Sequence, residues 1–240
     1  MGHSPPLHQT GIGVVAPHDF ALDRELWRWV PDDISLHITR MPHLSLAATM
    51  EMAVHVSDPA LVARGVTDVH AVSPLVTAYA CTSGSFVGGL AGEGALVAAM
   101  RDAGAAPAVT TSGALLSALR HLALTRIATA TPYTADLTAG LSGFLAEAGV
   151  DVVAAAGLGL ISDIWTVPYD VTARLVRDTD TDDAQAVFIS CTNLPTYDVI
   201  AALEAELGKP VLTANQVTIW SALTVIGRKA VGPGQRLLES

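Results

Sequence analysis

The sequence predicts an α/β fold with two pseudo-symmetric, Rossmann-like halves, each a mostly parallel sheet flanked by helices. One observation is the alternation of short apolar runs with helical patterns along all 240 residues, which is typical of β–α units. The other is an internal repeat. Cys81 and Cys191, each followed by threonine, lie 110 residues apart, and the strand–proline turns at Pro17 and Pro132 lie 115 residues apart.

In the first half, strands are expected at residues 11–16, 35–39, 71–80 and 108–111. Several of these are continuous apolar runs, as in strands that are covered on both faces. Helical patterns fill the intervals at residues 22–29, 45–63 and 92–103. Gly104 follows the last of them at the position of a C-cap glycine.

In the second half, strands are expected at residues 126–130, 151–156, 186–190 and 210–213, for the same reason. Helical patterns cover residues 113–122, 135–148, 170–177 and 197–207, and a further helical pattern follows at residues 216–226. Gly149 and Gly208 each follow a helix at the C-cap position.

The last segment, from about Thr213, is expected to cross back to the first half. We therefore expect one half formed by residues 1–112 and 213–240, carrying Cys81, and a second half formed by residues 113–212, carrying Cys191. Ligands of open α/β sheets bind beyond the carboxyl ends of the strands, where both cysteines lie. The predicted active site is the cleft between the halves.

Composition excludes several classes of function. Lys and Arg number 13 against 23 Asp and Glu, which gives a net charge of −10 without a basic cluster and argues against nucleic-acid binding. No apolar run approaches the ~20 residues of a membrane span. The first ten residues lack the charged start and apolar stretch of a signal peptide, so we expect a cytoplasmic protein.

Neither a metal nor a cofactor is expected. The histidines and cysteines show no metal-ligand spacing. The glycine-rich stretch 83–89 lacks the ending of a phosphate loop, and residues 11–13 begin a dinucleotide fingerprint that is not completed. With only two cysteines, no disulfide framework is plausible and both thiols are expected to be free.

Cys81 and Cys191 are the candidate catalytic residues. Composition alone favours two buried thiols that act as small hydrophobic groups. However, each cysteine directly follows an apolar strand, and we expect each to open a helix, whose dipole favours the thiolate. Backbone N–H groups of the following residues are expected to bind a carboxylate or an oxyanion there. These residues are Thr82, Ser83, Thr192 and Asn193.

Two opposed thiols allow three kinds of chemistry on a small carboxylate. A thiolate can remove an α-proton while the other thiol returns one, which gives racemisation. A thiolate can add to a double bond, allow rotation and leave, which gives cis–trans isomerisation without a cofactor. Cys191 alone can protonate an enediolate after loss of carbon dioxide. A small-carboxylate binding protein without turnover is the non-enzymatic alternative.

The motifs at residues 81–83 (Cys-Thr-Ser) and 190–194 (Ser-Cys-Thr-Asn-Leu) resemble the two catalytic motifs of the aspartate/glutamate racemase superfamily. Within it, the branch of maleate cis–trans isomerases and arylmalonate decarboxylases is most similar. Weaker matches are at residues 111–114, 130–133, 210–215 and 232–234.

The resemblance implies that both cysteines do the chemistry, and that Thr82, Ser83, Tyr133 and the amide after Cys191 bind the substrate carboxylate. Arylmalonate decarboxylases carry glycine at the first position, so Cys81 favours an isomerase or racemase.

Two departures from this pattern concern the substrate. Maleate isomerases have Pro-Ser-Ser-Asn after the first strand, where this chain has Pro17, His18, Asp19 and Phe20. A second binding asparagine of that family corresponds to Ile164. Both changes indicate a substrate with one apolar end.

Several site residues have a second interpretation. His18 is either a proton carrier or a turn residue, and Asp19 is either part of the site or the cap of the helix near Leu22. Tyr133 binds substrate or packs on a strand end. Apolar helices such as residues 87–103 could pair subunits in a homo-oligomer.

Overall fold

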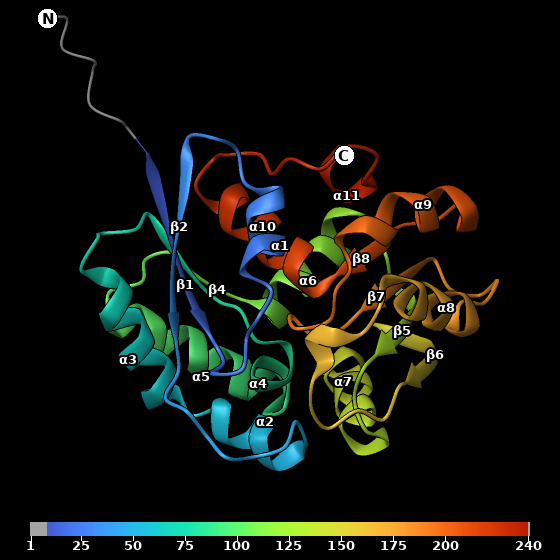
Figure 1. Ribbon diagram of the computed structural model, residues 1–240, viewed down its shortest axis with the longest axis horizontal. Coiled ribbons are helices and arrows are strands. Elements are labelled where there is room, and N and C mark those ends of the chain that lie inside the picture. The colour runs from blue at the N-terminus through green and yellow to red at the C-terminus, as the bar shows by residue number, and fades with distance from the viewer. Residues whose placement is uncertain (1–8, 240) are drawn as a thin grey trace, which may run out of the picture.

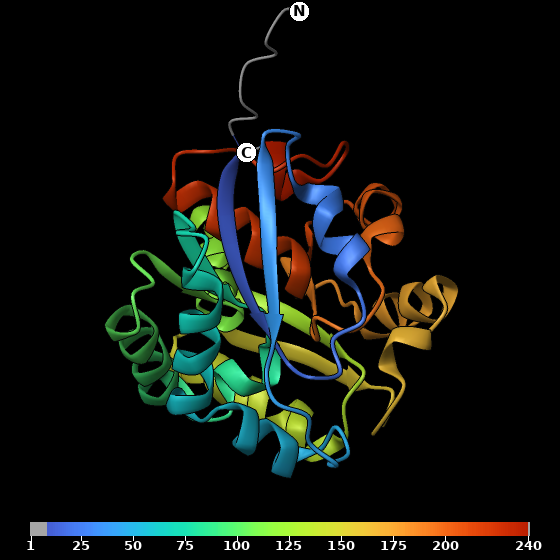
Figure 2. The same cartoon turned by 60° about the vertical axis from the view of Figure 1, so that its left-hand side comes forward.

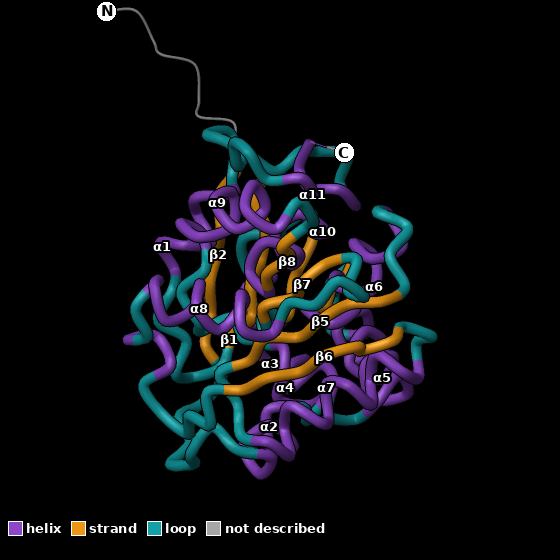
Figure 3. Tube along the Cα trace, turned by 90° about the vertical axis from the view of Figure 1, so that its right-hand side faces the viewer, coloured by secondary structure: helices purple, strands orange, loops and turns teal. Residues whose placement is uncertain are grey.

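The computed structural model describes residues 9–239 and contains two four-stranded parallel sheets (Figure 1). The first has the order β2-β1-β3-β4 and the second the order β6-β5-β7-β8, side by side in Figure 3. The strands are β1 (Thr10–Ala16), β2 (Ile34–Arg40), β3 (Val76–Tyr79), β4 (Ala108–Thr110), β5 (Arg126–Thr131), β6 (Asp151–Gly157), β7 (Ala186–Ile189) and β8 (Val211–Thr213). Because each half repeats the same strand order, the predicted fold class is confirmed.

Helices connect the strands. They are α1 (Asp23–Leu26), α2 (Met50–Val56), α3 (Pro59–His70), α4 (Thr82–Phe86), α5 (Gly89–Asp102), α6 (Thr111–His121), α7 (Ala135–Glu147), α8 (Tyr169–Thr179), α9 (Tyr197–Leu207), α10 (Ala214–Val225) and α11 (Arg236–Glu239), with the 3-10 turns η1 (Trp27–Trp29) and η2 (Ile164–Thr166). The predicted C-cap glycines Gly104, Gly149 and Gly208 have the positive φ angles 109°, 75° and 71° that such caps require.

Two predicted elements were wrong in extent. The helix expected at residues 45–63 is two helices, because the Asp58 side chain accepts the N–H of Ala60 and Pro59 occupies the first turn of α3. The strand expected from residue 71 begins only at Val76. Ser73, with φ of 50°, and the following proline form a turn before it.

Successive residues of the inner strands point into different cores. In β1, Val14 belongs to a central core, whereas Val15 packs with residues of α3 and α5 such as Val66 and Met100. In β7, Phe188 faces the central core, and Val187 packs in a third cluster with α8 and α9. Both faces of each sheet are therefore covered, and α1 and α3 lie on opposite sides of the first sheet (Figure 2).

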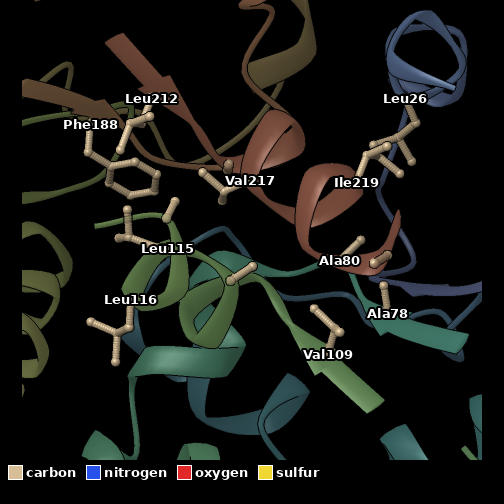
Figure 4. Packing of buried hydrophobic residues seen from close by; sticks show 14 of the residues in the cluster. Leu26, Ala78, Ala80, Val109, Leu115, Leu116, Phe188, Leu212, Val217 and Ile219 are labelled. Carbon is tan, nitrogen blue, oxygen red and sulfur yellow. The ribbon is translucent and has the colours of Figure 1, made fainter. Parts of the chain in front are cut away.

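The central core is shared by the two sheets (Figure 4). Phe188 and Leu212 of the second sheet lie near Leu115 of α6, while Val217 and Ile219 of α10 lie between them and the first sheet. Helix α10 contacts α6, β3 and α1, so the chain does return to the first half after β8. The division at residues 112 and 213 stays a prediction.

No helix within residues 9–239 has both the length and the apolar character needed to cross a bilayer. The same residues contain no group of three histidine, cysteine or acidic side chains placed to hold a metal ion. Most of the segment behind the signal-peptide argument, residues 1–8, and two of the histidines in it lie outside the described chain.

Candidate active site

Both cysteines line one pocket, whose cavity volume is about 40 Å³. Most of its wall comes from the segments that follow β1, β3, β5 and β7, namely residues 17, 19, 20, 81–83, 133 and 191–193. The carboxyl ends of strands from both sheets thus meet at this pocket, the position at which α/β folds bind ligands.

Cys81 ends β3 and is the N-cap of α4. Its Sγ accepts the N–H of Gly84 at 3.3 Å and lies 3.8 Å from the Ser83 Oγ. The side chain is 4% exposed. The predicted helix at this cysteine is confirmed, although it is only five residues long.

Gly84 permits a close approach of three groups behind Cys81. A Cβ at this position would overlap the Tyr79 hydroxyl and lie 3.1 Å from the Cys81 sulfur. The Tyr79 hydroxyl itself donates to the carbonyl of Val56 at the end of α2. A side chain at position 84 therefore displaces either the thiol or the tyrosine.

A pair of buried serines fixes the backbone of the Cys81 turn. Ser85 Oγ donates to the carbonyl of Cys81 at 2.6 Å and lies 2.7 Å from Ser112 Oγ. Ser112, at the start of α6, donates its N–H to Ser85. The Thr-Ser-Gly-Ala motif at residues 111–114 thus supports the first cysteine from behind.

Cys191 does not open a helix, and that prediction was wrong. Its φ is 82°, and residues 191–196 form a turn before α9 begins at Tyr197. Pro195 disfavours helical geometry at Leu194, which explains the break. The Cys191 sulfur still accepts a backbone N–H, that of Asn193, at 3.4 Å.

Glu25 and Asn215 clamp the Cys191 turn. The buried Glu25 carboxylate accepts the N–H and hydroxyl of Thr196 and the amide of Asn215. The Asn215 amide also donates to the carbonyl of Thr192 at 2.9 Å. The turn is therefore held by α1 from the first half and by α10, and sequence reasoning missed the role of Glu25.

The polar side chains around the thiols differ in whether they already have a hydrogen-bond partner in the protein. Thr192 Oγ1 donates to the carbonyl of Ala80, and the Asn193 side chain bonds the β1–α1 loop, so both are engaged within the protein. The buried Thr82 hydroxyl has no partner among the described residues. The Tyr133 hydroxyl accepts from Ser190 at 3.3 Å. Thr82 thus lines the pocket with a hydroxyl that makes no hydrogen bond within the described chain.

The predicted preference for thiolates is overturned by burial. Removal from water raises the pKa of Cys81, although the Gly84 N–H opposes this. Burial also raises the pKa of Cys191 to about 12, against the N–H of Asn193. Burial likewise raises the pKa of Tyr133 well above its usual value. In the ligand-free pocket both thiols are therefore protonated at neutral pH.

The structure separates the two members of the His18-Asp19 pair. Asp19 lines the pocket and does not cap α1, because the N-cap is Leu22 and no side chain bonds there. His18 is not part of the pocket wall. Its ring packs edge-on against His43 with 5.2 Å between centroids, which agrees with a turn residue.

The remainder of the wall is apolar. Phe20 and Ile164, each 3% exposed, line the pocket, as does Pro17. Sequence reasoning missed the other wall residues, which come from the segment before α2, from α2 itself and from α7: Ala48, Thr49, Met52, Ala53 and Leu137. They carry no motif, and only the break at Asp58 could have indicated that α2 is a separate element.

Two free thiols at equivalent strand ends, in one pocket lined by residues of two related α/β halves, define a class of two-cysteine α/β proteins. The model of the family described as arylmalonate decarboxylase matches residues 38–238, and the chain belongs to this family. The resemblance inferred from the sequence is confirmed.

Curated relatives have two activities. An arylmalonate decarboxylase of Bordetella bronchiseptica is 35% identical over 151 residues, which is 61% of this chain and 62% of that protein. A maleate isomerase of Geobacillus stearothermophilus is 28% identical over 143 residues, 58% of this chain and 57% of that protein. The aligned parts cover less than two thirds of either relative.

Solved structures match over nearly the full length. A liganded double variant of arylmalonate decarboxylase superposes with a TM-score of 0.88 at 28% identity, covering 97% of this chain and all of that one. A Nocardia farcinica maleate cis–trans isomerase variant with a covalently bound succinylcysteine intermediate has the same fold, with a TM-score of 0.86 at 24% identity, covering 95% and 98%.

Proposed function

We propose that this protein is a cofactor-independent isomerase of a small carboxylate that uses Cys81 and Cys191 together. The observation that supports this most is the pocket itself, whose wall contains both free thiols, each within reach of a backbone N–H. Membership in a family that includes maleate isomerases and a decarboxylase supports the same chemistry.

The cis–trans reaction needs a nucleophile and an acid. Cys81 is the better nucleophile, because the Gly84 N–H, Tyr79 and Ser83 all favour its thiolate. The Cys81 thiol first gives its proton to solvent, and the thiolate sulfur then bonds to the β-carbon of an α,β-unsaturated carboxylate. The π electrons move to the α-carbon, and Cys191 supplies a proton there. After rotation about the new single bond, Cys191 takes the proton back and Cys81 leaves.

The substrate carboxylate binds beside Cys81 in this scheme. Negative charge builds up on the carboxylate while the α-carbon is anionic, so nearby donors lower the barrier. Thr82, whose hydroxyl lacks a partner, Ser83 and Tyr133 are the proposed donors. The same site also suits α-proton exchange, which makes a carboxylate racemase the nearest alternative.

A decarboxylase is the second candidate, favoured by the family description and the 35% identical relative. Variants separate the candidates when maleate, cis-but-2-enoate and phenylmalonate are followed by NMR in deuterated buffer. We expect both Cys81→Ala and Cys191→Ala to abolish isomerisation or α-proton exchange. Decarboxylation that survives in Cys81→Ala supports the decarboxylase, and no thiol-dependent reaction of any probe supports a binding protein.

The same proposal includes the compartment in which the protein works and its assembly. Two free thiols keep their function in a reducing compartment, which favours the cytoplasm. A homo-oligomer stays a prediction that the mass of the protein in solution tests.

A further inference from the structure

Asp19 gives the pocket its charge. It is the one acidic side chain in the pocket wall, and among residues 9–239 no lysine, arginine or histidine lines the cavity. A site that binds a dianion in proteins normally supplies at least one cation or an additional set of donors. Here the wall contains the donors that follow the two cysteines together with the apolar side chains of Phe20, Met52 and Ile164.

The Asp19 carboxylate is not neutralised by the surrounding protein. It has no hydrogen bond or ion pair within the described chain, whereas its backbone carbonyl is held by the Asn193 amide at 3.0 Å. Arg40, at the end of β2, is a cation that reaches this loop. It donates to the carbonyl of Phe20 and pairs with Asp23 at 2.6 Å, so it is engaged elsewhere.

The charge of Asp19 acts on the reacting groups. It is among the causes that raise the pKa of Cys81 and of Cys191, after burial. A carboxylate that disfavours two thiolates also disfavours a second carboxylate in the same space. The overall net charge of −10 adds to this repulsion at long range.

We infer that Asp19 is a specificity-determining residue that restricts the pocket to monocarboxylates with an uncharged, apolar remainder. This inference rests on the proposed function and names its substrate class: short α,β-unsaturated or α-branched monocarboxylic acids. The single carboxylate binds beside Thr82, and the hydrocarbon part contacts Phe20 and Ile164. Dicarboxylates such as maleate and malonates are disfavoured by the unpaired charge.

Pairs of probes that differ by one carboxylate test this directly. Isobutyrate and methylmalonate differ only in a methyl group against a carboxylate, as do cis-but-2-enoate and maleate. Binding to the full-length protein is measured by calorimetry at low and high salt. We expect the monoanion of each pair to bind about tenfold or more tightly than the dianion, and high salt to reduce the difference.

Asp19→Asn removes the charge and keeps the shape. We expect it to improve dianion binding about tenfold and to leave monoanion binding little changed. Asp19→Ser gives the same result if the first variant folds poorly. Asp32→Asn, in the exposed turn before β2, is the matched control for net charge, because Asp32 does not line the pocket, and it should change neither ratio.

Equal binding of mono- and dianions to the unmodified protein overturns the inference, as does an equal gain in Asp19→Asn and Asp32→Asn. Failure of the proposed function looks different. In that case the binding preference persists while no thiol-dependent turnover of any probe occurs. Efficient turnover of maleate that is unaffected by Asp19→Asn leaves the proposed function intact and contradicts the role of Asp19.

Discussion

At the scale of single residues, the two cysteines have different surroundings. Cys81 sits at a helix N-cap with three groups that favour its thiolate, whereas Cys191 lies in a turn with φ of 82° and fewer donors. Burial outweighs these donors at both positions. The chemical role of each thiol therefore depends on what the bound substrate changes in the pocket.

The raised pKa values predict slow alkylation at neutral pH. A higher pKa leaves less thiolate at any pH below it, so labelling by iodoacetamide should be slower than for free cysteine and should rise about tenfold per pH unit. Cys191, with a pKa of about 12, should label more slowly than Cys81. Peptide mass spectrometry between pH 7 and 10 measures both rates. Labelling of either thiol at the rate of free cysteine at pH 7 contradicts this account.

Gly84 should be intolerant of even one methyl group. Gly84→Ala pushes against the Tyr79 hydroxyl and the Cys81 sulfur, so we expect at least a tenfold loss of activity and a destabilisation of about 1–3 kcal/mol. Gly143→Ala in α7 is the control, because nothing lies within 4 Å of a Cβ there. Activity assays and thermal melts compare the two variants. A fully active Gly84→Ala would show that Tyr79 and Cys81 can move to make room for the methyl group.

At the scale of elements, the clamp on the Cys191 turn connects three segments. Removing the Glu25 side chain leaves the N–H and hydroxyl of Thr196 without their acceptor inside the protein, and the Asn215 amide keeps only the Thr192 carbonyl. We expect Glu25→Ala to cost about 1–3 kcal/mol of stability and to accelerate alkylation of Cys191 but not of Cys81. Glu51→Ala on the exposed face of α2 is the control. If Glu25→Ala accelerates the alkylation of both thiols equally, the contacts of Glu25 do not act on the Cys191 turn alone.

The helices and strands show which parts of the fold could be predicted from the sequence. Strands and C-cap glycines were found within a few residues, because apolar runs and glycine geometry are local signals. The predicted helices at residues 45–63 and at Cys191 were wrong because Asp58-Pro59 begins a new helix and Pro195 disfavours helical geometry before it. The roles of Met52 and Leu137 could not be predicted, since no local pattern says which helix face meets a pocket built by distant strands.

At the scale of the whole molecule, the two sheets share one core through α6 and α10. The internal repeat in the sequence indicated two halves, and it placed the cysteines at equivalent strand ends. It did not indicate that the halves are packed together by a common set of side chains. That packing holds the segments after β3 and β7 around one pocket.

A shared core predicts one cooperative unfolding transition. Leu212→Ala removes a fully buried side chain of β8 that packs in the central core, and we expect it to cost about 2–5 kcal/mol. Calorimetry should show a single transition moved to lower temperature. Two separate transitions, with only one of them shifted, would mean that the halves unfold independently.

If the Cys81 and Cys191 thiols face one ligand site, a single bound ligand should protect both of them from alkylation. Both thiols are alkylated at pH 9 in the presence of increasing isobutyrate or methylmalonate, and each labelled peptide is quantified. We expect alkylation of Cys81 and of Cys191 to fall along the same curve against ligand concentration, with one midpoint for each ligand. Protection of one thiol alone, at concentrations that saturate its curve, contradicts the claim.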